Sequence, residues 1–518
     1  MSKNKTYEVE AYQKNGIKRL VLVAISLIVE LLFIVLLINR FYTTYSWIEV
    51  IMRILIIFFV LYIYSLPKTS TMKMPWIILM LSMPVFGVVL YLLVGLSGST
   101  RSKKERFAML DKAIMPNLPD HEEVLKKISH KRISNICKYI KDYSLYPAYN
   151  NSDVSYYADT NKALDEQIRQ LKKAKKFIFL EYHAIEPKTV WKRIQDVLVE
   201  RAQKGVEVRI FYDDLGSIGF INYNFVDEMK SLGFKCKVFN IFKFGLKFFL
   251  NNRDHRKMTI IDGKVGFVGG YNLADEYFNI TRPYNAWKDA GIKIEGEAVK
   301  NLTASFLEMW NGEGNHKDML DDFNIYFPPV EHKAKEEVYV QPYADSPMND
   351  ETVGENVYMD IIDSSEDYVY FMTPYLIITD EFAKSLILAA KRGVDVRIIT
   401  PGVPDKKLTY SLTRSYYHSL VKAGVKIFEW TPGFLHAKVC LSDDEVATVG
   451  SINLDYRSFY HHFENGCLIH HGKAINDIRK DFEKTFKEAE DVSEKYRSGR
   501  TAVLRFSQLL LRMIAELI

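Results

Sequence analysis

The chain changes its hydrophobic pattern near residue 100. Before that point apolar residues run almost without interruption over 20–38, 47–66 and 75–95, and the charged residues inside these runs are Glu30, Glu49 and Arg53. About 20 apolar residues are enough for an α-helix to cross the ~30 Å hydrocarbon core of a bilayer. The pattern therefore predicts that residues 1–100 form a membrane anchor of two or three transmembrane helices.

Basic residues flank these runs on both sides. Lysines and an arginine lie within residues 3–19, and Arg101, Lys103, Lys104 and Arg106 follow the third run. The positive-inside rule places both clusters in the cytoplasm, which two crossings allow and three do not. We therefore expect one of the charged runs to lie in the interface or to enter without crossing. The four cysteines, which show no pairing pattern, favour the cytoplasmic side of the cell membrane for the rest of the chain.

Beyond about residue 150, short apolar runs typical of buried strands alternate with amphipathic helical segments. Strand-like runs at 176–182 and 206–212 flank a helical stretch, and the same order returns at 367–372 and 394–399. This order predicts an α/β fold of mixed sheets flanked by helices. Because the second set of segments repeats the first almost letter for letter at 203–211 and 391–399, we expect two similar halves related by a pseudo-twofold axis.

The boundaries follow from this repeat. We expect a linker over 101–150, a first half over 151–330, a second half over 331–490, and an amphipathic C-terminal segment over 491–518.

Each half contains one copy of a motif that reads HxK, four residues, D, six residues, and then G[GS]xN. The copies span 255–272 and 436–453. They contribute His255, Lys257, Asp262, Gly270 and Asn272 in the first half and His436, Lys438, Asp443, Ser451 and Asn453 in the second.

The spacing of the motif indicates its chemistry. In an extended segment residues i and i+2 face the same side, so each histidine and its lysine are expected to face one pocket. Two imidazoles and two ammonium groups suit a phosphodiester: one imidazole attacks phosphorus, and the other protonates the departing alcohol. The lysines would stabilise the charge on the non-bridging oxygens. Asp262 and Asp443, five residues beyond the lysines, are expected to face away and orient the backbone.

Composition narrows the function further. The 69 Lys and Arg against 64 Asp and Glu give a net charge of +5, which does not indicate a nucleic-acid-binding protein. The four cysteines have no metal-ligand spacing and fit a reducing compartment. We therefore expect no metal, no cofactor and no nucleic-acid partner, and the sequence leaves the oligomeric state open.

The duplicated motif resembles the HKD motif of the phospholipase D superfamily, and the apolar N-terminal runs make the chain similar to the bacterial cardiolipin synthases of that superfamily. Further signs are Pro84-Val85-Phe86-Gly87, Asn252 to Lys257, Trp287-Lys288-Asp289, Asp455 to Phe459, and Phe463-Glu464.

The resemblance implies that two molecules of phosphatidylglycerol in a membrane give cardiolipin and glycerol. It also implies that the His, Lys and Asp of both motifs form the active site, often with the first histidine, here His255, as nucleophile. By analogy Asp289 and Glu464 accept hydrogen bonds from the catalytic imidazoles.

Three alternatives stay open at this point. A hydrolytic phospholipase D of the same fold differs only in letting water take part in the second step. A nuclease of the superfamily fits poorly with the apolar runs and the balanced charge. A silent lipid-binding scaffold fits poorly with intact His and Lys in both halves. The two-histidine scheme predicts a bell-shaped pH dependence and no effect of chelators.

Overall fold

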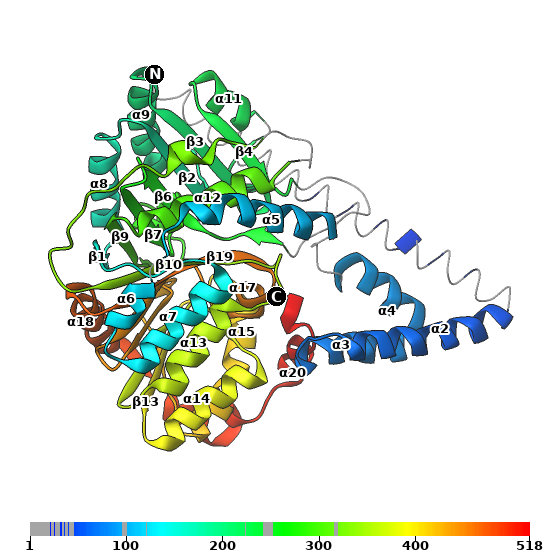
Figure 1. Ribbon diagram of the computed structural model, residues 1–518. Helices are drawn as coiled ribbons and strands as arrows, with labels where there is room; N and C mark the ends of the chain where they lie inside the picture. Colours follow the sequence, from blue (N-terminus) through cyan, green and yellow to red (C-terminus); the bar gives the residue numbers. More distant parts are fainter. Residues whose placement is uncertain are drawn as a thin grey trace.

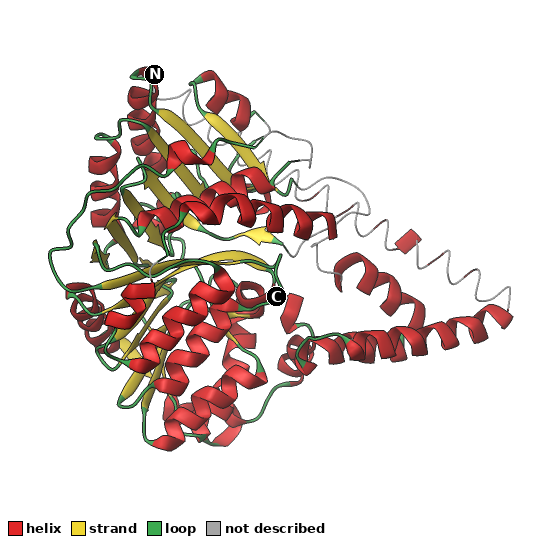
Figure 2. Ribbon diagram, viewed as in Figure 1, coloured by secondary structure: helices red, strands yellow, loops and turns green. Residues whose placement is uncertain are grey.

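The computed structural model describes residues 21, 25, 29, 32, 33, 36, 40, 46–95, 101–120, 122–222, 224–241, 252–314 and 320–517. Within these residues two α/β halves lie against each other, one above the other in the view of Figure 1, and the strands of each form a sheet flanked by helices (Figure 2). The predicted α/β class with two similar halves is confirmed.

The two sheets have the same strand order. The first is a seven-stranded sheet in the order β1 (Ser152–Tyr157), β9 (Gly291–Gly296), β7 (Val265–Gly269), β6 (Lys257–Ile261), β2 (Phe177–Tyr182), β3 (Glu207–Asp213) and β4 (Lys235–Phe239). The second follows the order β10 (Tyr339–Asp345), β19 (His462–His470), β17 (Val446–Gly450), β16 (Val439–Ser442), β11 (Tyr368–Met372), β13 (Asp395–Pro401), β14 (Lys426–Trp430) and β20 (Ala489–Asp491). In both sheets the strands that follow helices pair in parallel and the motif strands pair antiparallel.

Helices cover both faces of the first sheet. The apolar side chains of β2 point alternately to the two faces, so each face has to be covered. Ile178 and Leu180 belong to the core under the outer helices, whereas Phe179 faces the other half and stacks on Phe306 at 4.4 Å between ring centres. The helices of this half are α8 (Thr160–Leu171), α9 (Thr189–Gln203), α10 (Asp214–Ser217), α11 (Phe225–Ser231) and α12 (Val299–Gly312).

Capping residues in the sequence explain where helices of the second half begin and end. In α14 the Thr379 hydroxyl accepts a hydrogen bond from Phe382 N at 3.0 Å, and Gly393 ends the helix in the left-handed region at φ 101°. The helices of this half are α13 (Val353–Ser364), α14 (Asp380–Arg392), α15 (Lys407–Ser415), α16 (Tyr417–Lys422), α17 (Tyr456–Tyr460) and α18 (Lys473–Lys487), followed by α19 (Ser493–Arg497) and α20 (Phe506–Met513).

Residues 101–150, expected as a linker, contain three helices: α5 (Arg101–Ile114), α6 (Glu122–Lys127) and α7 (Lys131–Ser144). Their apolar side chains, such as Leu110 and Ile140, belong to the same core as strands of both halves. This segment therefore fastens the two halves together rather than merely connecting them to the N-terminal part.

The N-terminal part contains α2 (Ser46–Ser65), α3 (Ser70–Ser82), α4 (Pro84–Leu90) and a π-helical turn, η1 (Tyr91–Gly95). The third apolar run is not one helix, because Pro84 has no N–H to continue α3. After this break α4 folds back onto α3, and a Cβ at Gly87 would lie 2.7 Å from the Met80 Cα. The expectation of a transmembrane helix over 75–95 was wrong.

None of the described helices is long and apolar enough to cross a membrane. In α2, Glu49 and Arg53 leave an uncharged stretch of 54–65, which is only about 18 Å long at 1.5 Å per residue. The expected span over 47–66 covers nearly the same residues as α2. Most of the expected span over 20–38 lies outside the described residues.

Candidate active site

Two short strand pairs join the halves at the two HxK motifs. In one pair β5 (Arg253–Asp254), just before His255, lies parallel to the start of β19. In the other, β15 (Gly433–Leu435), just before His436, lies parallel to β8 (Ala286–Lys288) of the first half. His255 N then donates to Phe463 O at 2.9 Å, and His436 N to Lys288 O at 2.7 Å. The pairing is reciprocal, as a pseudo-twofold relation requires.

Each imidazole is held by a carboxylate of the opposite half. His255 Nδ1 lies 2.8 Å from Glu464 Oε1, and His436 Nδ1 lies 2.7 Å from Asp289 Oδ2. All four side chains are buried. Because an ionised carboxylate only accepts, each Nδ1 carries the proton and each Nε2 carries a lone pair. The geometry thus gives two imidazoles of defined tautomer.

The two motif lysines stand beside the imidazoles. Lys257 Nζ donates to the carbonyl of His255, and Lys438 Nζ donates to the carbonyl of His436. Burial is the main cause that lowers the pKa of Lys257 to about 7 and that of Lys438 to about 8. The nearby carboxylates oppose this shift, since an anion favours the ammonium form.

The pKa of both imidazoles is also lowered. Burial and Lys438 bring the pKa of His436 to about 3, against the opposing charge of Asp289. Burial and Lys257 bring the pKa of His255 well below its usual value. A bound anion such as a phosphodiester would offset these effects and raise both values.

Asp262 and Asp443 lie at the far end of the motif strands. Asp262 accepts hydrogen bonds from the backbone N–H groups of 175–177, and Asp443 does the same for 366–368. Each residue therefore ties the end of its motif strand to the start of the neighbouring strand. Neither contacts an imidazole or a motif lysine in the hydrogen bonds of the described residues.

The small residues of the motif lie against the carboxylates. A Cβ at Gly270 would be 2.2 Å from Asp289 Oδ1, so glycine is needed there. The Ser451 hydroxyl donates to Glu464. Asn272 bridges the Ala184 N–H and the Tyr277 hydroxyl, and Asn453 donates to Asp455 Oδ2 at 3.0 Å.

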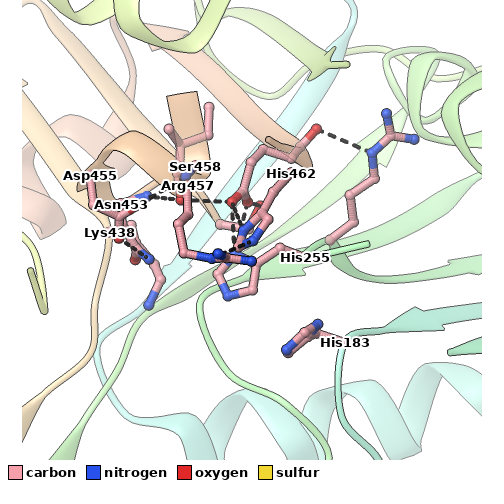
Figure 3. Close-up of polar contacts among 12 residues, drawn as sticks. His183, His255, Lys438, Asn453, Asp455, Arg457, Ser458 and His462 are labelled. Carbon is pink, nitrogen blue, oxygen red and sulfur yellow. Dashed lines mark hydrogen bonds and ion pairs between the residues drawn. The ribbon is translucent and has the colours of Figure 1, made fainter. Parts of the chain in front are cut away.

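A cavity of about 590 Å³ contains both histidines and both asparagines. Three further side chains, which are not among the predicted site residues, lie at its His255 end: His183, Arg457 and His462 (Figure 3). His183 and His462 have ring centres 5.1 Å and 5.4 Å from that of His255. His462 precedes Glu464 by two residues, as Trp287 precedes Asp289. This shared spacing was the sequence signal that could have identified His462 as a residue of the cavity.

A sequence profile described as "Cardiolipin synthase, PLD-like domain" matches residues 167–310 and 358–486, which is more than half of the chain and includes both motifs. The chain belongs to the PLD-like cardiolipin synthase family. A second profile, "Phospholipase_D-nuclease N-terminal", matches residues 54–95.

Named members of the cardiolipin synthase family resemble nearly the full chain. Cardiolipin synthase 1 of Staphylococcus aureus strain MRSA252 is 29% identical over 90% of this chain and 96% of its own. The cardiolipin synthase of Clostridium perfringens strain SM101 is 31% identical over 85% and 93%. An uncharacterized protein of Streptococcus mutans is 38% identical over 89% and 99%.

The fold of the family is shared with a solved structure. Phosphatidylserine synthase of Haemophilus influenzae superposes with a TM-score of 0.56 over 75% of this chain and 98% of its own, at 14% identity. At that identity the likeness concerns the fold alone.

One group of described residues has donor atoms close enough for a metal ion, within 4.8 Å: His255, His462 and Glu464. Most of these atoms already have partners, although His462 Nδ1 has no hydrogen bond among the described residues and lies 3.6 Å from Glu464 Oε1. Glu464 accepts hydrogen bonds from His255 and from the hydroxyls of Ser451 and Ser458. Arg457 Nε donates to His462 Nε2 at 3.2 Å. The positive charge of Arg457 also opposes the binding of a metal ion, so the residues fit a hydrogen-bonded network better than a metal centre.

Proposed function

We propose that this member of the cardiolipin synthase family transfers a phosphatidyl group from one phosphatidylglycerol to another, giving cardiolipin and glycerol. The observation that supports this most directly is the pair of imidazoles in one cavity, each oriented by a carboxylate of the opposite half. A hydrogen-bond acceptor on Nδ1 raises the basicity of Nε2 and fixes its direction. This is the requirement for a nucleophile and an acid–base group that face the same phosphorus.

In the first step we assign His255 as the nucleophile, as the family resemblance implies. Its Nε2 lone pair forms a bond to phosphorus while the bond from phosphorus to the glycerol oxygen breaks. His436, protonated at Nε2, gives that proton to the departing glycerol. The phosphodiester anion and Asp289 together favour the imidazolium form of His436. Glycerol leaves, and the phosphatidyl group stays on His255.

In the second step His436 acts as the base. Its Nε2 takes the proton from a glycerol hydroxyl of the second phosphatidylglycerol, and that oxygen attacks phosphorus while the P–N bond to His255 breaks. Both imidazoles return to their starting states. Lys257 and Lys438 stabilise the charge on the non-bridging oxygens in both steps.

Turnover of phosphatidylglycerol tests this function. Purified protein in lipid–detergent micelles would be followed by mass spectrometry of lipids and released headgroup. We expect one glycerol per cardiolipin. Phosphatidic acid without cardiolipin would make the protein a hydrolytic phospholipase D, and no turnover of either kind would overturn the assignment of lipid chemistry.

We also propose that the protein works at the cytoplasmic side of a cell membrane, with phosphatidylglycerol and cardiolipin as its lipid partners. The four cysteines are buried thiols without a disulfide, which suits a reducing compartment. Fractionation of cells and protease protection of inverted vesicles test this placement. Cleavage of the catalytic halves from outside intact protoplasts would contradict it.

A further inference from the structure

Helix α20 presents an apolar face to solvent. Phe506 is 75% exposed, and Leu509 and Leu510 are 47% and 48% exposed. Val503, just before the helix, is 70% exposed, and Ile514 at its end is 46% exposed. Scattered single apolar residues are normal on a surface, but a contiguous apolar face on one helix marks an interaction site.

The opposite face of α20 is bound to α15 by polar contacts. Gln508 Nε2 donates to Ser411 O at 3.0 Å. Arg512 Nε donates to the Ser415 hydroxyl at 3.0 Å, and its guanidinium lies 4.4 Å from the ring centre of Tyr416. The helix is therefore fixed in orientation, with its apolar face held outward rather than free to turn inward.

The helix that holds α20 also lines the catalytic cavity. Lys406, next to the first residue of α15, and Thr409 in its first turn both belong to the cavity wall. At about 1.5 Å of rise per residue, Ser411 lies only about 3 Å further along the axis of α15 than Thr409. Helix α15 thus links the cavity wall to α20, whose apolar face lies on the side turned away from α15.

The segment that follows α20 contacts the N-terminal helices. Glu516, which follows α20 in the turn η6 (Ala515–Leu517), accepts a hydrogen bond from Trp76 Nε1 at 3.3 Å and lies 3.9 Å from Lys68 Nζ. These contacts hold the C-terminal segment beside α3, as Figure 1 shows. On α3 and just after it, Leu81 and Met83 are exposed.

Exposed basic side chains lie on α20 and on the elements next to it. They are Arg505 before α20, Lys406 and Lys407 at the start of α15, and Lys495 and Arg497 in α19, where Arg497 pairs with Glu494 at 2.9 Å. An apolar helix face edged with basic residues is typical of a helix that lies in the interface of an anionic bilayer.

We propose that α20 lies flat on a bilayer of anionic phospholipid, with Phe506, Leu509 and Leu510 among the acyl chains, and that it sets the cavity entrance at the membrane surface. The choice of phosphatidylglycerol as the anionic lipid rests on the proposed function. In this placement the C-terminal segment and α3, which Trp76 and Lys68 hold beside it, lie at the same bilayer surface.

Depth-dependent quenching tests the placement. The full chain with Leu510→Cys would carry a nitrobenzoxadiazole probe in vesicles of phosphatidylglycerol and phosphatidylcholine, with spin-labelled lipid as quencher. The native cysteines are all buried, so labelling is confined to the new thiol. The matched control is Lys192→Cys, an exposed position on α9 of the first half. We expect quenching at 510 to exceed that at 192 by at least about threefold; equal quenching would overturn the proposal.

A second variant gives an independent readout. Leu509→Glu with Leu510→Glu places two charges on the face, while Ser507→Glu adds one at a neighbouring exposed polar position as control. We expect the double variant to lower turnover of vesicle lipid at least about tenfold more than turnover of monomeric short-chain phosphatidylglycerol. Equal losses on the two substrates would contradict the docking role. The quenching needs no turnover, so it stays readable if the proposed reaction itself fails.

Discussion

The surroundings of the two motif histidines differ although their contacts are the same. Along the chain Arg253-Asp254-His255-Arg256-Lys257 corresponds to Phe434-Leu435-His436-Ala437-Lys438. The histidine and the lysine are kept, and every other position changes from a charged to an apolar residue. The backbone pairing and the carboxylate bond of each imidazole are nevertheless equivalent.

The first half holds its motif with charges. Arg253 donates to Asp213 Oδ1 from Nε at 3.1 Å and from Nη2 at 2.8 Å, and Asp213 also accepts from Asp254 N. Arg256 is fully buried, and its guanidinium donates to the Ser305 hydroxyl at 2.9 Å. Burial raises the pKa of Asp254 to about 7, so the network beside His255 contains a carboxyl group that titrates near neutral pH.

The second half holds the same backbone by packing. Phe434 lies 5.0 Å from Trp287 and 5.9 Å from Tyr284 between ring centres, and Leu435 and Ala437 are fully buried. Both halves therefore repeat the histidine, the lysine and the carboxylate contact, whereas the residues that support them differ. This difference makes the cavity unequal, because its His255 end is basic and its His436 end is aromatic.

The largest effect is expected from the histidines. His255→Asn and His436→Asn each remove a group that forms or breaks a bond in both steps. We expect each to lower cardiolipin formation by at least about 10³-fold, with an unchanged circular dichroism spectrum. Retention of activity within tenfold in either variant would break the equivalence of the halves.

The carboxylates that hold the imidazoles come next. In Asp289→Asn the loss of the negative charge lowers the pKa of His436 still further, because Asp289 favours the imidazolium. We expect kcat to fall about 10²-fold and its alkaline limb to move to lower pH, since the acid form of His436 is lost sooner. Glu464→Gln is the matched variant at His255. An alkaline limb of the kcat–pH profile that is at the same pH in Asp289→Asn as in the unmodified protein would contradict this account.

The lysines set a pH dependence of their own. With pKa values of about 7 and about 8, Lys257 and Lys438 lose their protons, and the site loses positive charge, as pH rises through this range. We expect kcat/KM to fall about tenfold between pH 7 and pH 9, because it reports the free protein. Lys257→Arg, which keeps its charge, should move the fall upward. A constant kcat/KM up to pH 9 would exclude the lysines as the cause.

The smallest effect belongs to the two aspartates behind the motifs. Asp262 and Asp443 both have φ 54°, a backbone conformation that asparagine also adopts. The Asp→Asn substitution therefore removes only the negative charge to which three backbone N–H groups donate. We expect each variant to lower the free energy of unfolding by about 1–3 kcal/mol, and kcat less than Asp289→Asn does. Denaturant unfolding measures this, and unequal losses would show that the halves differ here too.

The local part of this organisation can be predicted from the sequence. The duplication, the strands and the histidine–lysine pairs follow from spacing within a few residues, since side chains of a strand alternate. The direction of Asp262 and Asp443 away from the lysines follows from the same periodicity.

What spacing could not give is contact between distant segments. His255 and Glu464 are 209 residues apart, and only family analogy linked the acid to an imidazole. The bend at Pro84 was readable as a helix break, but the return of α4 onto α3 depends on packing at Gly87. In α7, buried Ile133, Ile136 and Ile140 have helical spacing, a signal that a linker assignment overlooked.

The stereochemical course at phosphorus tests the central claim most directly. Phosphatidylglycerol with a phosphorothioate of known configuration would be turned over, and the configuration of the product phosphodiester determined. Two successive displacements through a phosphohistidine invert twice, so the account predicts overall retention. Overall inversion would mean a single direct displacement, and the two halves would then not share one covalent intermediate.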